Sequence, residues 1–186
     1  VDMINQFMNK FAIAFGFRGK LFKDILKAWK ILEKEFNIKH MAYNHALPHI
    51  TVLAGQTRYI DKIYKKLKKI KFKKFKLQSP GLGIFANEKP NLYIRWENNL
   101  KLLKNSEKIR KTTIHHFKKI FHHQVSNNSL WVPKTTIAWQ DLKYKDMKKI
   151  FVKMKFMFKK KFVNINQIYI IEFSTTEKII YKINLG

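Results

Sequence analysis

Two short segments of this 186-residue chain have almost the same sequence, and they constrain its fold more than any other feature. The first is "LPHITV", residues 47–52, and the second is "VPKTTI", residues 132–137. Each contains an apolar residue, Pro, a basic residue, a spacer, Thr and an apolar residue. The copies lie near one quarter and three quarters of the chain, which indicates a fold with two related halves.

The spacing within each copy predicts which side chains act together. Side chains two positions apart on a strand point to the same face of a sheet. His49 and Thr51 then share one face, and Lys134 and Thr136 share another. If a pseudo-two-fold axis relates the halves, both faces meet in one cleft. Two basic groups and two hydroxyls suit a phosphate, because hydroxyls donate to its oxygens and basic groups neutralise charge or transfer protons.

The composition allows a well-packed interior and points to an anionic partner. Hydrophobic residues make up 46% of the chain, and 39 Lys and Arg against 12 Asp and Glu give a formal net charge of +27. Such a charge attracts polyanions, of which RNA is the obvious candidate. Nearly all of it comes from Lys, which also fits the codon bias of an A/T-rich genome, and both origins stay open. Cys is absent, which excludes disulfides and thiolate metal sites.

Hydrophobic periodicity predicts alternating strands and helices. We expect strands within 10–17, 37–55, 71–85, 91–98, 130–139 and 167–185, the last as a hairpin. We expect helices within 20–36, 58–70, 99–123 and 141–158. Thr57 is a candidate cap for the second helix, and Asn105 with Ser106 is a candidate break and cap within the third. The Lys-rich stretches 65–76 and 159–162 are expected to be solvated faces, and 124–129 to be a polar loop.

The alternation of strands and helices predicts an α+β fold with antiparallel sheet, in which residues 1–186 form a single domain of two pseudo-symmetric lobes.

The paired motif in a chain of this size resembles the two-histidine (2H) phosphoesterase superfamily. Within it, the chain is most similar to the RNA 2′,3′-cyclic phosphodiesterases, also called 2′-5′ RNA ligase-like proteins. The resemblance runs from "FAIAFGF" to "KIIYKINL" and includes "PGLGIFANEKPNLYIRW" between the motifs. It implies a bilobal fold, with antiparallel sheets lining a central cleft and helices packed outside. It also implies metal-independent chemistry, in which paired His residues are acid and base and the Thr residues hold the phosphate.

The chain departs from the family pattern at one of the two expected catalytic positions. His49, Thr51 and Thr136 match the pattern, but Lys134 stands where the second His is expected. The basic residue that often follows the second motif is also missing, because Trp139 follows Ala138. Lys has a reference pKa of about 10.4, so it is too basic to accept a proton at neutral pH unless it is strongly desolvated.

We therefore expect His49 to be the base and Lys134 to be the cation or acid of an RNA or nucleotide phosphoesterase. Its substrate would be a cyclic phosphate or a 2′-5′ phosphodiester. The alternative is a catalytically degenerate protein that binds RNA or nucleotide phosphates without turnover.

Other residues are candidates for the rim of the cleft. Tyr43, Trp139 and Phe17 are candidates to stack a base, with core packing as the alternative reading. His45 is a candidate to line the cleft mouth, with a solvated loop position as the alternative. We expect an RNA or nucleotide partner, a monomer and a cytoplasmic location.

We expect no cofactor, no metal ion and no contact with a membrane. No apolar run reaches the roughly 18 residues that span a bilayer, and no secretory signal is evident. The four His residues 115, 116, 122 and 123 form pairs that lie about 10.5 Å apart on a helix, too far to share a metal.

Overall fold

A computed structural model describes residues 9–121 and 131–186 of the chain. Its strands are β1 (Lys10–Gly16), β2 (His49–Gln56), β3 (Phe75–Ser79), β4 (Gly81–Phe85), β5 (Asn91–Arg95), β6 (Lys119–Phe121), β7 (Lys134–Ala138), β8 (Lys161–Ile165), β9 (Gln167–Phe173) and β10 (Glu177–Asn184). Its helices are α1 (Lys20–Phe36), α2 (His40–Tyr43), α3 (Ile60–Lys68), α4 (Leu100–Thr113), the 3₁₀ turn η2 (Ile114–His116) and α5 (Tyr144–Phe158).

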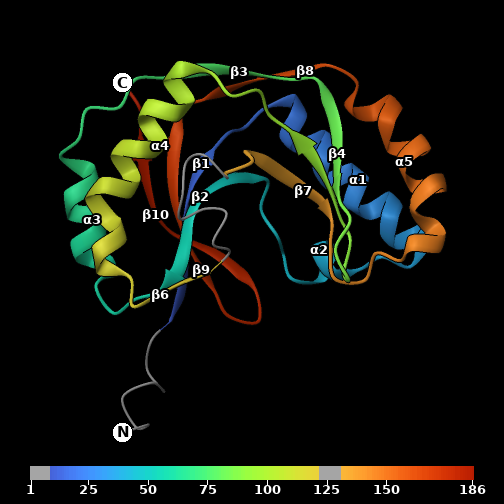
Figure 1. Cartoon of the computed structure of the whole chain (residues 1–186), viewed down its shortest axis with the longest axis horizontal. Coiled ribbons are helices and arrows are strands. Elements are labelled where there is room, and N and C mark those ends of the chain that lie inside the picture. Colours follow the sequence, from blue (N-terminus) through green and yellow to red (C-terminus); the bar gives the residue numbers. More distant parts are fainter. Residues whose placement is uncertain (1–8, 122–130) are drawn as a thin grey trace, which may run out of the picture.

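The two copies of the motif lie in different antiparallel sheets. The first is in β2, within a sheet of order β10-β9-β1-β2-β6, and the second is in β7, within a sheet of order β4-β5-β7. Strands β3 and β8 pair with each other and run along one end of the molecule, above the two larger sheets in Figure 1. This arrangement places one motif in each half of the fold.

Helices cover the outer face of each sheet. Helices α1 and α5 contact the β4-β5-β7 sheet, and α3 and α4 contact the other sheet (Figure 1). The buried face of α1 repeats at spacings of three and four residues, as an amphipathic helix requires, and consists of Leu21, Ile25, Ala28, Trp29 and Leu32. The helix ends at Asn37, which takes the left-handed conformation (φ 56°) that often stops a helix.

One hydrophobic cluster runs through both halves. It includes Phe15 of β1, Ile50 of β2, Ile94 of β5 and Ile137 of β7, all of them fully buried. Phe15 also meets Phe75 of β3 edge to face, with ring centroids 5.3 Å apart. The two sheets therefore pack on a shared interior, which holds the motif strands in fixed relative positions.

The structure differs from the sequence prediction in the region expected to be one long helix. Helix α4 ends at Thr113, and the chain then turns through η2 into β6, which pairs with β2. Asn99 caps α4 by accepting a hydrogen bond from the Leu102 amide at 2.8 Å. The predicted break at Asn105 and Ser106 is wrong, because both residues lie buried inside α4. His122, His123 and the expected polar loop 124–129 lie outside the described residues.

Two smaller points concern Thr57 and the Lys-rich stretch 159–162. Thr57 precedes α3 but does not cap it: its hydroxyl accepts from the Tyr59 amide and donates to the His116 carbonyl at 2.7 Å. Lys159, Lys160 and Phe162 are exposed, as expected for a solvated face. Residues 161–165 form β8, which was not expected, because its partner β3 is remote in sequence.

Candidate active site

The first motif fixes the orientation and tautomer of His49. Its Nδ1 lies 2.5 Å from the Leu47 carbonyl oxygen, and its Nε2 lies 3.0 Å from Thr51 Oγ1. A carbonyl oxygen can only accept a hydrogen bond, so Nδ1 carries the proton. Nε2 is then the basic nitrogen, and it accepts from the Thr51 hydroxyl. The arrangement points Nε2 at the hydroxyl of the motif threonine.

Glu177, at the start of β10, holds the segment that leads into this motif. Its Oε2 accepts from the Leu47 amide at 2.9 Å and lies 4.0 Å from His49 Nδ1. Its own amide donates to the Asn44 carbonyl at 3.0 Å. Glu177 therefore holds Leu47 in place, and the carbonyl of Leu47 orients the His49 imidazole. Glu177 was not predicted as a site residue from the sequence. No local signal pointed to it, because its contact with Leu47 joins residues that are 130 positions apart.

The second motif forms a matching pair on β7. Lys134 Nζ donates a hydrogen bond to Thr136 Oγ1 at 3.1 Å, as expected for side chains on one face of a strand. The ammonium also lies 5.9 Å from the centroid of the Tyr93 ring. The side chain is partly buried, and this burial lowers the pKa of Lys134 to about 8 because desolvation disfavours the charged form. Lys134 therefore differs from a lysine in water, whose pKa is about 10.4.

Two hydrogen bonds join the backbone of β2 to side chains of the second motif and of the segment before it. Thr135 Oγ1 donates to the His49 carbonyl at 3.0 Å, and Trp131 Nε1 donates to the Thr51 carbonyl at 3.0 Å. Thr135 Oγ1 also accepts from Trp96 Nε1 at 3.0 Å. The structure therefore brings the first motif's backbone within hydrogen-bond distance of side chains from the other half, although the two motifs lie in different sheets.

The register of β5 against β7 adds two residues to the face that carries the second motif. Tyr93 lies directly opposite Thr136, and Arg95 lies directly opposite Lys134. Residues directly opposite each other in an antiparallel pair point to the same side. Gly83 makes room there, because a Cβ at that position would lie 2.6 Å from the Tyr93 ring. Tyr93 and Arg95 were not predicted as site residues from the sequence. Their spacing of two did indicate that they share one face of a strand.

The strands beside β2 shape the face that carries His49. Gly16 lies opposite His49 and Ala14 lies opposite Thr51. Ala14 also pairs with Tyr169 on its other side, and a Cβ at Gly16 would lie 2.2 Å from the Tyr169 ring. The buried Tyr169 donates from its hydroxyl to Gln167 Oε1 at 2.9 Å. Two small residues and a tyrosine thus form the floor beside the first motif.

The remaining predicted site residues separate into one core residue and a group around α2. Phe17 is fully buried and meets Trp96 with ring centroids 6.1 Å apart, so the prediction that it stacks a base is wrong: it has no exposed ring face. Tyr43 is 61% exposed at the end of α2. His45 is exposed in the following turn. Trp139 is partly buried, with its ring 5.6 Å from that of His40 at the start of α2.

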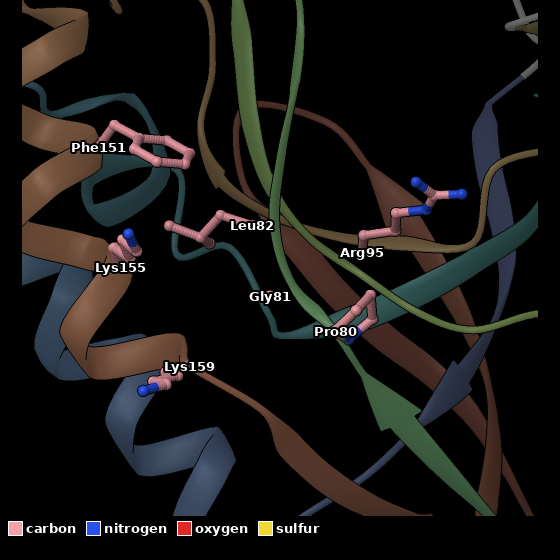
Figure 2. A pocket seen from close by; sticks show the side chains of 7 residues that line it. All are labelled: Pro80, Gly81, Leu82, Arg95, Phe151, Lys155 and Lys159. Atoms are coloured by element: carbon pink, nitrogen blue, oxygen red, sulfur yellow. The ribbon is translucent and has the colours of Figure 1, made fainter.

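Two pockets lie against the β4-β5-β7 sheet or the segments that flank its strands. The larger, of about 500 Å³, is lined by Arg95, Trp96, Asn98, Trp131 and Pro133 among others. The smaller, of about 330 Å³, lies between the β4-β5 strands and α5 and is shown in Figure 2. Both include Arg95 and Pro80, and neither is lined by His49 or Lys134.

Within residues 9–121 and 131–186, every helix is too short or too polar to span a bilayer. In the same residues, no group of three or more His, Asp or Glu side chains is placed to hold a metal ion.

Comparison with known proteins identifies the fold. No family model matches the chain, and no curated protein matches its sequence. Among solved structures, Escherichia coli LigT in complex with 3′-AMP matches over 96% of this chain and 99% of its own, with a TM-score of 0.53 and 12% identity. Usb1 of Kluyveromyces marxianus matches over 95% of this chain and 98% of its own, with a TM-score of 0.52 and 7% identity. A structure described as a phosphoesterase has a TM-score of 0.52 and 11% identity over 96% of this chain.

Over nearly its whole length, the chain thus matches the fold of LigT, of Usb1 and of a phosphoesterase. The chain therefore has the 2H phosphoesterase-like α+β fold, which confirms the fold inferred from the paired motif. At these identities the likeness establishes the fold, and the chemistry has to be argued from the residues of this chain.

Proposed function

We propose that this chain is a metal-independent phosphoesterase that opens a 2′,3′-cyclic phosphate or cleaves a 2′-5′ phosphodiester in RNA or a nucleotide. One observation carries the proposal. His49 bonds Thr51 on β2, Lys134 bonds Thr136 on β7, and Thr135 joins the two strands at the His49 carbonyl. Each half of the fold thus offers one proton-transfer group and one hydroxyl. Together these groups can supply the acid, the base and the hydrogen-bond donors for hydrolysis of a phosphodiester.

The roles of the two basic groups follow from their surroundings. Nε2 of His49 carries the lone pair, so it takes the proton from the attacking water. Lys134, with a pKa of about 8, is mostly protonated at neutral pH and gives its proton to the leaving alkoxide. When phosphate binds, the Thr51 hydroxyl turns from His49 Nε2 to a non-bridging phosphate oxygen, which leaves Nε2 open to the attacking water. The Thr136 hydroxyl donates to another such oxygen, where negative charge develops in the transition state.

A binding protein without turnover is the second candidate, and the presence of Lys at position 134 favours it. A lysine neutralises phosphate charge well but is a poorer acid–base group than histidine. In this reading the same four side chains hold RNA or nucleotide phosphates, and the loss of one acid–base partner removes roughly 10²–10⁴-fold of the rate.

One assay separates the two candidates. The full chain is incubated with 2′,3′-cyclic nucleotides and 2′-5′ oligoadenylate in the presence of a chelator. We expect product, and we expect His49→Ala to lower the rate by about 10²–10⁴-fold. His115→Ala is the matched control, because His115 is exposed in η2. Product formation that is equal in His49→Ala and the control would refute the enzyme. Saturable binding without product by the unmodified chain would support the second candidate.

A further inference from the structure

Arg110 is a buried cation without a partner. It lies in the last turn of α4 and is only 5% exposed. Within the described residues, its Nε, Nη1 and Nη2 atoms are buried without a hydrogen-bond partner, and it forms no ion pair with a carboxylate. Burial lowers the pKa of Arg110 to about 10, so the guanidinium stays charged at neutral pH. An unpaired buried charge destabilises a fold, and native structures rarely keep one.

The neighbouring polar side chains of α4 do not offer this guanidinium a partner. Ser106 and Thr113 lie on the same buried face of the helix. Their hydroxyls donate to carbonyls of α4 itself, at 2.8 and 2.7 Å. The negative end of the helix dipole lies in the last turn and offsets part of the cost of the charge. The rest of the charge is uncompensated and acts on the surrounding interior.

One contact places this charge next to the first motif. Cζ of Arg110 lies 5.1 Å from the centroid of the Trp131 ring, a distance at which a cation and an aromatic face attract each other. Trp131 is 3% exposed, and its indole N–H donates to the Thr51 carbonyl at 3.0 Å. Helix α4 also contacts β2 directly. A single side chain therefore separates the guanidinium from the strand that carries His49 and Thr51.

A buried charge at this place acts differently from the many exposed lysines of the chain. Water and salt screen an exposed charge, whereas a charge in the interior is screened much less and acts over a longer distance. In the proposed function, a phosphate binds the Thr51 hydroxyl, and its oxygens gain negative charge in the transition state. An uncompensated cation behind β2 favours both.

We propose that Arg110 is a positioning residue of the phosphate site: it holds Trp131 against the Thr51 carbonyl, and its uncompensated charge favours an anion at the first motif. The inference rests on the proposed function for the place of the phosphate, and it adds a residue that lies outside both motifs. Arg110 then lowers the stability of the fold and raises the affinity of the site for anions.

Calorimetry with inorganic phosphate, together with thermal unfolding, tests this role on the full chain at pH 7. Arg110→Met removes the charge and keeps a long apolar side chain against Trp131. We expect phosphate affinity to fall about three- to tenfold, the effect of losing one charge that acts through the interior. The thermal midpoint should stay the same or rise, because an unpaired buried charge is removed. A residue with a purely structural role would lower the midpoint instead.

Two further variants separate charge from shape and buried charge from exposed charge. Arg110→Lys keeps the cation and should bind phosphate within about twofold of the unmodified chain. Lys108→Met removes a charge from the exposed side of the same helix and should change the affinity by less than about twofold. The loss in Arg110→Met should persist at about 500 mM salt, where exposed charges are screened.

Three results would overturn the positioning role: a lower midpoint in Arg110→Met, an unchanged phosphate affinity in that variant, or equally weak binding in Arg110→Lys. Thr51→Val removes one phosphate donor and locates the bound phosphate. If it leaves the affinity unchanged, the phosphate lies elsewhere and this inference falls with the proposed phosphate position. If the His49-dependent assay yields no product while the Arg110 results hold, the catalytic proposal fails and the anion site remains.

Discussion

At the scale of single residues, Lys134 determines what chemistry this fold can perform. A lysine in water keeps its proton far above neutral pH, which would make it a fixed positive charge. Partial burial on β7 lowers its pKa to about 8, so its proton can be given up near physiological pH. In the proposed mechanism, this environment lets the Lys134 ammonium take part of the role that a second imidazole has in the paired-histidine pattern.

This pKa predicts the pH dependence of turnover. The protonated lysine is the acid, so kcat/KM should fall as the pH rises through about 8. Lys134→His should move the falling limb towards the reference pKa of histidine, about 6.5. The check is a pH profile of kcat/KM with a 2′,3′-cyclic nucleotide for both proteins. Identical falling limbs would show that another group is the acid.

The same shift predicts a pH-dependent difference in stability. The pKa of Lys134 is about 8 in the folded chain and 10.5 without the perturbation, so unfolding takes up a proton between these values. Stability then rises with pH across this window, and below it the charged lysine destabilises the fold. Lys134→Met should raise the thermal midpoint at pH 7, and its advantage should shrink as the pH approaches about 10. Lys149→Met, at an exposed position of α5, is the control, and a constant advantage of Lys134→Met at all pH values would contradict the prediction.

At the scale of secondary-structure elements, the site depends on how β2 and β7 meet. They belong to different sheets, and no ladder of backbone hydrogen bonds joins them in the described part of the chain. Side chains make the junction instead: the Thr135 hydroxyl connects Trp96 to the His49 carbonyl, and the Trp131 indole reaches the Thr51 carbonyl. These polar contacts, together with the hydrophobic interior that both sheets share, fix the relative position of the two motifs.

Replacing Thr135 by Val should disrupt this junction. The change keeps the side-chain shape but leaves the Trp96 N–H and the His49 carbonyl without their partner, which costs about 1–3 kcal/mol for each buried group left unsatisfied. We expect a lower free energy of unfolding in urea and a lower affinity for inorganic phosphate. Thr112→Val is the matched control, because that hydroxyl bonds only within α4, to the Lys108 carbonyl at 2.7 Å. Equal effects of both substitutions would show that the junction does not organise the site.

Elements with strong local patterns could be predicted from the sequence. Helix α1 has the expected bounds, because its apolar spacing and the turn at Asn37 are local signals. The fold was inferred from the doubled motif. Strands β6 and β8 were missed because they depend on remote pairing partners, β2 and β3. Glu177 was missed for the same reason, since only the folded chain brings it to Leu47.

At the scale of the whole molecule, the net charge of +27 is spread over a surface with few acidic partners. Lys111 pairs with Glu107 and Lys153 with Glu35, and such exposed pairs neutralise little of the total. The resulting field acts on any polyanion over a distance of about one Debye length. This long-range attraction is physically separate from the short-range contacts of Lys134, which lies in a partly buried position.

These two contributions should respond differently to salt. For single-stranded RNA, the logarithm of the affinity should fall linearly with the logarithm of salt concentration, with a slope of about −0.7 for each phosphate neutralised. For a cyclic mononucleotide, kcat/KM should fall much less between about 50 and 200 mM salt, because one phosphate is contacted and partly buried charges are screened less. Fluorescence anisotropy with a labelled oligonucleotide and initial-rate assays at the same salt concentrations measure both quantities. If RNA affinity shows the same shallow dependence as the mononucleotide, the surface lysines do not bind the strand, and codon bias becomes the better account of the charge.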